Sequence, residues 1–271
     1  MYIIFDIGGT HMRFATSEDG EEFSHVVSIA TPGIFADGRE AIEQVAESLG
    51  LEDPTHAIGG IAGIVDDGKL SYAPNLEEWA GVDIAGELKE IFGVETSVYN
   101  DALLGGLGEA IHGAGKGKDI VAYITVGTGI GGARIVDGAP DEYAEGFEPG
   151  HQIVDYEELL SLEELVSGTA IEKRLDTDAE HVDEPSVWGS LGKTLGVGIY
   201  NSVLHWSPDI VVVGGSVALK APDIFFDTAR ETYVGLMNRS GRKAVPITPG
   251  KLDDSPVLYG ALEMLKLDGV V

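Results

Sequence analysis

A glycine-rich turn between two short apolar runs occurs twice in the sequence, and the copies lie about 120 residues apart. The first is Asp6-Ile7-Gly8-Gly9-Thr10, and the second is Gly127-Thr128-Gly129-Ile130-Gly131-Gly132. Adjacent glycines tolerate positive φ and let backbone N–H groups approach a phosphate closely. Either turn alone is more typical of an ordinary β-hairpin. The recurrence instead predicts an internal duplication, in which two phosphate loops face one another across a cleft.

The segments around these turns alternate between strand-like and helix-like patterns. Helical spacing of apolar residues marks the stretches 38–49, 84–92, 187–204, 223–237 and 257–267. Apolar runs typical of buried strands occupy 2–5, 56–65, 95–99, 119–126 and 210–213. This alternation predicts an α/β protein. The sequence has no Walker lysine pattern, so we do not expect a P-loop fold.

The strand-like run 95–99 leads into Asn100-Asp101-Ala102, and a helix-like run follows from Leu103. Asp101 suits the N-cap of that helix, which is the usual role of an aspartate at such a junction. It also suits a general base that accepts a hydroxyl proton, as the aspartate that orients the attacking alcohol does in kinases. Phosphoryl transfer to an alcohol requires such a carboxylate beside groups that hold phosphates. We therefore predict a kinase built around Asp101.

Two other segments near the N-terminal half carry polar groups suited to this chemistry. Asp6 can hold a hydrated magnesium ion, and Thr10 adds a hydroxyl to the first loop. Asn75, close to Trp79, is either a simple turn residue or a carboxamide that binds a sugar hydroxyl beside an aromatic ring.

The second half of the chain adds two candidate segments. Glu148 and His151 flank a Pro-Gly turn that can bring both side chains into one pocket, although loop residues of these types are usually exposed. Gly214-Gly215 follows the buried run 210–213. In an α/β sheet, the carboxyl end of such a strand is where a nucleotide would sit.

The amino-acid composition limits the cellular compartment and the binding partners that we expect for this protein. With 46 acidic and 17 basic residues the formal charge is −29, which disfavours binding to nucleic acid and to anionic lipid. The acidity either keeps the protein soluble or reflects a salt-rich cytoplasm, and unfolding across a salt series would separate these interpretations. No run approaches the roughly 20 apolar residues of a membrane span, and no signal pattern opens the chain, so we expect a cytoplasmic protein. The sequence contains no cysteine, which excludes disulfides, thiolate nucleophiles and Cys-ligated zinc.

Taken in order, the motifs resemble those of the ROK family of sugar kinases and related repressors, in the actin/hexokinase-like ATPase superfamily, from about residue 2 to 265. The segments that carry the resemblance are Asp6–Thr10, Ala73-Pro74-Asn75-Leu76 with Trp79, Asn100-Asp101-Ala102, Gly127–Gly132, Glu148-Pro149-Gly150-His151, Ser161-Leu162-Glu163 and Gly214-Gly215. The resemblance implies a two-lobed ribonuclease H-like or actin-like fold of duplicated βββαβαβα units, with a cleft between the lobes. It implies a first lobe of residues 1–98, completed by the C-terminal helix 253–271, and a second lobe of residues 99–252.

The resemblance also implies roles for individual residues. Asp101 would be the general base, and Asp6 would bind Mg²⁺ through water. The residues implied for ATP are Gly8, Gly9, Thr10, Gly127, Thr128, Gly129, Gly131, Gly214 and Gly215, with Asp6 beside them. Those implied for the sugar are Asn75, Asn100, Glu148, His151 and Glu163. The family usually holds a structural zinc with this histidine and three cysteines; here the cysteines are missing and the intervening segment is short, so we expect no zinc, which leaves open how His151 and Glu163 are held.

The function implied is that of an ATP:hexose phosphotransferase acting at O6 of glucose or a related hexose. The alternatives are a kinase of fructose or of an N-acetylhexosamine (N-acetylmannosamine or N-acetylglucosamine), a non-catalytic sugar-binding regulator, or an ATPase or acyl-phosphate-forming enzyme on the same scaffold. Regulators of the family carry an N-terminal helix-turn-helix, whereas this sequence opens in the phosphate-loop strand. The resemblance further implies a homodimer, and the sequence does not select one hexose.

Overall fold

The computed structural model describes residues 1–141 and 146–271, which form two compact units. The first unit comprises Met1–Gly108 and Ser255–Val271, and the second comprises Glu109–Asp254. The first unit therefore extends past the expected boundary at residue 98 and includes most of helix α3 (Asp101–Ile111). The reason is close helix packing: a Cβ added to Gly108 would lie 2.1 Å from the carbonyl oxygen of Pro256, which starts helix α9 (Pro256–Leu267).

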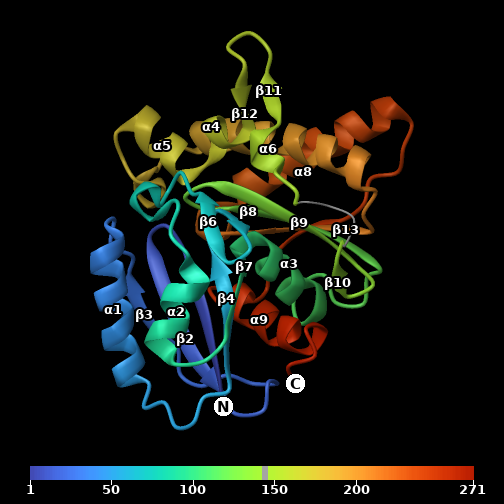
Figure 1. The fold of residues 1–271 in the computed structure, drawn as a ribbon. Coiled ribbons are helices and arrows are strands. Elements are labelled where there is room, and N and C mark those ends of the chain that lie inside the picture. The colour runs from blue at the N-terminus through green and yellow to red at the C-terminus, as the bar shows by residue number, and fades with distance from the viewer. Residues whose placement is uncertain (142–145) are drawn as a thin grey trace. The chain divides into compact units, whose positions relative to one another are not determined.

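The first unit is built on a five-stranded sheet with the strand order β3-β2-β1-β4-β7 (Figure 1). Its strands are β1 (Tyr2–Ile7), β2 (His11–Ser17), β3 (Val27–Ala30), β4 (His56–Ile61) and β7 (Thr96–Asn100). The pairs β3–β2 and β2–β1 are antiparallel, while β1–β4 and β4–β7 are parallel. A small hairpin of β5 (Ile64–Asp66) and β6 (Lys69–Tyr72) follows β4, and a 3-10 turn, η1 (Glu77–Trp79), follows the hairpin.

Helices cover this sheet according to the alternation of its apolar side chains. Ile3, Phe5 and Ile7 of β1 belong to one buried core with α1 (Phe35–Ser48) and α2 (Ile84–Phe92). Neighbouring side chains of a strand point to opposite faces. Ile4 therefore points to the other face, and α9 packs against β1 and β4.

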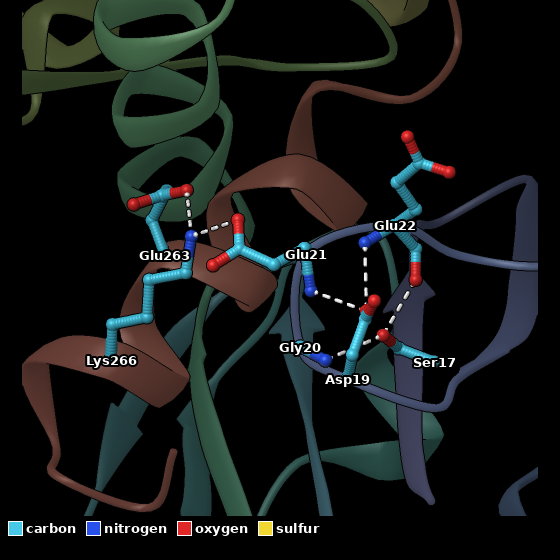
Figure 2. A network of polar contacts seen from close by, with 7 residues as sticks. All are labelled: Ser17, Asp19, Gly20, Glu21, Glu22, Glu263 and Lys266. Carbon is cyan, nitrogen blue, oxygen red and sulfur yellow. Dashed lines mark hydrogen bonds and ion pairs between the residues drawn. The ribbon is translucent and has the colours of Figure 1, made fainter.

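A network of polar contacts ties α9 to the turn after β2 (Figure 2). Asp19 Oδ1 accepts hydrogen bonds from the N–H groups of Glu21 and Glu22, at 2.9 and 3.3 Å, and this lowers the pKa of Asp19. Lys266 of α9 then forms ion pairs with Glu21 at 3.0 Å and with Glu263 at 2.9 Å. The ordered turn thus presents a carboxylate to a helix that is remote from it in sequence.

The second unit repeats the sheet topology of the first, with the order β10-β9-β8-β13-β14 (Figure 1). Its strands are β8 (Ile120–Val126), β9 (Ile130–Val136), β10 (Ala139–Pro140), β13 (Ile210–Gly214) and β14 (Ile247–Pro249). Two antiparallel pairs, β10–β9 and β9–β8, are again followed by two parallel pairs, β8–β13 and β13–β14. This confirms the duplicated α/β architecture predicted from the two glycine-rich turns.

Helices of the second unit pack closely because glycines line their contacts. Its helices and short hairpin are η2 (Pro149–His151), β11 (Ile153–Asp155), β12 (Leu160–Ser161), α4 (Leu162–Val166), α5 (Gly168–Leu175), η3 (Ala179–His181), α6 (Pro185–Trp206), α7 (Ser216–Lys220) and α8 (Asp223–Ser240). A Cβ added to Gly192 of α6 would lie 2.2 Å from the carbonyl oxygen of Phe225 in α8. Only glycine permits this approach of two helix backbones. Within the described residues, no helix has both the length and the apolar character that a bilayer span would need.

Candidate functional site

The first glycine-rich turn connects β1 to β2, as predicted. The Gly8 N–H donates to the His11 carbonyl at 2.9 Å, and Thr31, which follows β3, donates from Oγ1 to the Gly8 carbonyl at 2.7 Å. Asn75 lies in a turn directly against this loop, since a Cβ added to Gly9 would come within 2.8 Å of the Asn75 Cβ. The structure therefore brings Asn75 next to the first loop, although the two are far apart in sequence.

Asp6 ends up buried at the end of β1, with 7% of its surface exposed. Its cross-strand neighbour on β2 is Arg13, whose Nη1 lies 3.2 Å from Asp6 Oδ2. No group of three potential ligands for a metal occurs within residues 1–141 and 146–271. Mg²⁺ does not need such a cage, because it is usually bound through one or two carboxylates, water and the phosphates of a substrate. The donor set around Asp6 fits that mode of binding.

The junction of β7 and α3 assigns different roles to Asn100 and Asp101. Asn100 Oδ1 accepts a hydrogen bond from the Leu103 N–H at 3.0 Å, which is the N-cap interaction, and its Nδ2 donates to the Gly63 carbonyl at 2.9 Å. Asp101 is the first helical residue, and its Oδ1 contacts the Ala102 N–H at 2.8 Å. The interpretation of Asp101 as the N-cap was therefore wrong.

Gly60 of β4 makes room for this junction. A Cβ at Gly60 would lie 3.0 Å from the Asp101 Cα and 2.8 Å from Val257 of α9. Asp101 is half-buried at the carboxyl end of a parallel strand, where ligands of α/β sheets bind.

The second glycine-rich turn connects β8 to β9. The Gly127 carbonyl accepts from the Gly168 N–H at 2.8 Å, and the Thr128 carbonyl accepts from Thr169 Oγ1 at 2.9 Å. Both donors belong to the first turn of α5. The first turn of α5 therefore supports this loop through two hydrogen bonds.

The nucleotide-binding turn predicted at Gly214-Gly215 adjoins the same loop. Gly215 has φ 88° and lies against the end of β8, because a Cβ there would be 2.4 Å from the Val126 carbonyl oxygen. A Cβ added to Gly127 would in turn lie 3.8 Å from Ser216 Oγ. Two of the predicted nucleotide segments are thus neighbours within the second unit.

Glu148, His151 and Glu163 also gather within the second unit. Desolvation raises the pKa of Glu148, the charge of His151 opposes this, and the charge of Glu163 adds to it. The His151 N–H donates to the Glu148 carbonyl at 3.2 Å, which places these two residues in one turn, and both are exposed. Glu163 is anchored to the second loop, because its Oε2 accepts a hydrogen bond from the Ile130 N–H at 2.6 Å.

The segment that lacks the zinc cysteines is ordered by hydrogen bonds instead. Its β11–β12 hairpin ends at Ser161, which caps α4 through a reciprocal pair of bonds with Glu164. The Leu162 N–H donates to the Gln152 carbonyl at 2.9 Å, directly beyond His151. This reciprocal cap and the hairpin therefore contribute to the positions of Glu163 and the His151 turn.

Three residues that contact the predicted site were missed by sequence reasoning: Arg13, Thr31 and Thr169. Each reaches a predicted loop or carboxylate only because strands pair or helices pack in the folded chain. Arg13 could have been found from the sequence, because residues 6 and 13 face each other across a hairpin whose turn is centred on Gly9-Thr10. No local pattern marks Thr31 or Thr169.

Comparisons with known proteins agree with this architecture. The family model described as "ROK family" matches residues 2–267. A glucokinase of Thermotoga maritima is 26% identical, covering 96% of this chain and 96% of that protein. A xylose repressor of Bacillus subtilis is 27% identical, covering 74% of this chain and 58% of the repressor.

Solved structures share the fold. The crystal structure of a ROK hexokinase from Thermus thermophilus matches with a TM-score of 0.80 and 26% identity, covering 99% of each chain. The expected actin-like ATPase fold of this family is thereby confirmed. Because the family model spans nearly the whole sequence, this chain belongs to the ROK family.

Proposed function

We propose that this protein is an ATP-dependent sugar kinase, which transfers the γ-phosphoryl group of ATP to O6 of glucose or a related hexose. The proposal rests on the different interactions of Asn100 and Asp101 at the start of α3. Asn100 provides the N-cap of the helix, and the adjacent Asp101 carboxylate, whose Oδ1 also accepts the Ala102 N–H, would serve as the base.

In the proposed reaction, Asp101 accepts the proton of the sugar hydroxyl as its oxygen attacks the γ-phosphorus. The bond between the γ-phosphorus and the bridging oxygen to the β-phosphate breaks, and ADP leaves. Mg²⁺, held through water by Asp6 and by the phosphates, would neutralise charge on the transferring group. N–H groups of the two glycine-rich loops would donate hydrogen bonds to the phosphates.

The sugar would be held by Asn75, Asn100, Glu148, His151 and Glu163. These groups would select a hexose, because a sugar that leaves their polar atoms unpaired binds weakly. The likeness to the Thermotoga maritima glucokinase supports glucose as the first substrate to test. Fructose, N-acetylmannosamine and N-acetylglucosamine are the alternatives.

Release of ADP with a panel of hexoses, ATP and Mg²⁺, at low and at high salt, tests the function. Asp101→Asn should retain sugar binding in calorimetry and lose turnover by several orders of magnitude. Asp66→Asn, on the exposed β5–β6 hairpin, is the matched control and should behave as the wild type. Near-normal turnover of the Asp101 variant would rule out its role as the base.

A sugar-binding regulator is the second candidate, because the chain also resembles a xylose repressor. A regulator would bind a sugar in calorimetry but release no ADP with any member of the panel. That pattern in the wild type would replace the kinase proposal.

A further inference from the structure

Each glycine-rich loop is fastened by a threonine from another segment of the chain. In the first unit, Thr31 donates from Oγ1 to the Gly8 carbonyl at 2.7 Å and from its N–H to the Thr10 carbonyl at 2.9 Å. In the second unit, Thr169 donates from Oγ1 at 2.9 Å and from its N–H at 3.2 Å, both to the Thr128 carbonyl. The same pair of donors, one hydroxyl and one amide, therefore holds both copies of the loop.

Because the peptide bond is planar, a hydrogen bond that fixes a carbonyl group also fixes the direction of the following N–H. In a trans peptide the C=O and the following N–H point in opposite directions. When Thr31 fixes the Gly8 carbonyl, the Gly9 N–H must point away from Thr31. When Thr169 fixes the Thr128 carbonyl, the Gly129 N–H must likewise point away from Thr169.

Glycine makes this restraint necessary. A peptide next to glycine can rotate at little steric cost, because glycine adopts positive and negative φ about equally well. Without the threonine hydroxyls, the Gly8 carbonyl would lose its bond from Thr31 Oγ1, and the Thr128 carbonyl would keep only the longer bond from the Thr169 N–H at 3.2 Å. The N–H groups of Gly9 and Gly129 would then be held less firmly, and a bound phosphate would have to restrict their orientation, which weakens binding.

We propose that Thr31 and Thr169 are positioning residues for the nucleotide, which aim the Gly9 and Gly129 N–H groups at its phosphates. The inference rests on the proposed kinase function and deepens it. Glu163 supports the second loop from its other end through the Ile130 N–H, so that loop is held on both sides of Gly129.

The test replaces each hydroxyl by a methyl group of similar size, in Thr31→Val and Thr169→Val. Each change should raise the KM for ATP about three- to tenfold, the effect of one net hydrogen bond, and change kcat and the KM for the sugar less than about twofold. Thr31→Ser and Thr169→Ser keep the hydroxyl and should restore the wild-type KM for ATP. The two valine changes should multiply in the double variant, since they share no partner.

Thr194→Val is the matched control. Thr194 Oγ1 donates to the Ser190 carbonyl at 3.2 Å within α6, so this variant loses a similar bond away from both loops. Its KM for ATP should equal that of the wild type. Thr169 is exposed, so its valine variant decides the test even if Thr31→Val impairs folding.

Binding of the non-hydrolysable ATP analogue AMP-PNP, measured by calorimetry without sugar, separates this inference from the kinase proposal. If the wild type binds the analogue but phosphorylates no hexose, the kinase proposal fails, and weaker binding by the valine variants would still support the two threonines. The inference would be overturned if Thr169→Val left both the affinity for the analogue and the KM for ATP unchanged. It would also be overturned if the KM for sugar rose as much as the KM for ATP, or if the serine variants did not restore the wild-type KM for ATP. A wild type that binds no nucleotide would overturn both proposals.

Discussion

The Oδ1 atom of Asn100 accepts a hydrogen bond from the Leu103 N–H at 3.0 Å, while the Nδ2 of the same side chain donates to the Gly63 carbonyl at 2.9 Å. One amide thus caps α3 and also fixes the turn after β4. Asp101, the next residue, is positioned by a neighbour whose own orientation is fixed at both ends. This arrangement suits a base that must keep one direction during a reaction.

Replacing Asn100 should therefore affect stability as well as sugar binding. Asn100→Ala should lower the free energy of unfolding by about 1–3 kcal/mol, since it removes a cap and a second hydrogen bond. Asp83 of α2 offers a control, because its side chain caps the Gly86 N–H alone, so Asp83→Ala should cost less. Denaturant unfolding compares the two variants, and equal losses would argue against the Gly63 contact.

Arg13 should have opposite effects on stability and on magnesium. Arg13→Gln removes the cation beside Asp6 and should lower the free energy of unfolding by about 1–2 kcal/mol. The same change should lower the Mg²⁺ concentration for half-maximal activity about two- to fivefold, because the cation no longer opposes the ion. Arg13→Lys keeps the charge and should retain the wild-type Mg²⁺ dependence. If Arg13→Gln instead required more Mg²⁺ than the wild type for half-maximal activity, this would argue against Asp6 as the residue that binds Mg²⁺.

Glu109 should be among the residues least tolerant of change in the second unit. It is 2% exposed, its Oε1 accepts the N–H groups of Lys251 and Leu252 at 2.7 and 2.9 Å, and its Oε2 accepts that of Ala114 at 2.7 Å. In Glu109→Gln, the new NH₂ group must face one of these N–H donors, which should cost about 2–4 kcal/mol.

Hydrogen exchange is a direct readout, because it follows the three amides themselves. Exchange at Ala114, or at Lys251 and Leu252, should accelerate in Glu109→Gln, whereas Glu231→Gln on the exposed surface of α8 should leave it unchanged. Unaltered protection in the Glu109 variant would show that the carboxylate is dispensable.

The raised pKa of Glu148 predicts a dependence of stability on pH. A carboxyl whose pKa is higher in the folded protein stabilises it below the unfolded pKa, and this contribution is lost as the pH rises through the folded pKa. Glu148→Gln should therefore gain stability relative to the wild type as the pH rises from 4 to 7.

Thermal unfolding at both pH values checks this, with Glu157→Gln on the nearby exposed hairpin as the control. The Glu148 variant should also bind the sugar less tightly. A stability difference between Glu148→Gln and the wild type that does not change with pH would contradict the raised pKa.

The repeated turns and the Asn100-Asp101 junction could be predicted because each is a local pattern of a few adjacent residues. The cap by Asn100 could not be distinguished from a cap by Asp101, since both residue types cap helices equally well. Thr31 and Thr169 escaped prediction because their partners lie on segments that meet only in the folded chain. The boundary of the first unit was misplaced because the packing of Gly108 against Pro256 joins helices remote in sequence.

Helix α9 packs on β1 and β4, which are among the earliest strands to be synthesised. The whole second unit, residues 109–254, is translated between those strands and the helix. At the usual speed of a ribosome this interval lasts on the order of ten seconds, during which an apolar side of the sheet has no native cover. The second unit can acquire its structure while the chain is still emerging, whereas the first unit is completed only when its last helix has been made.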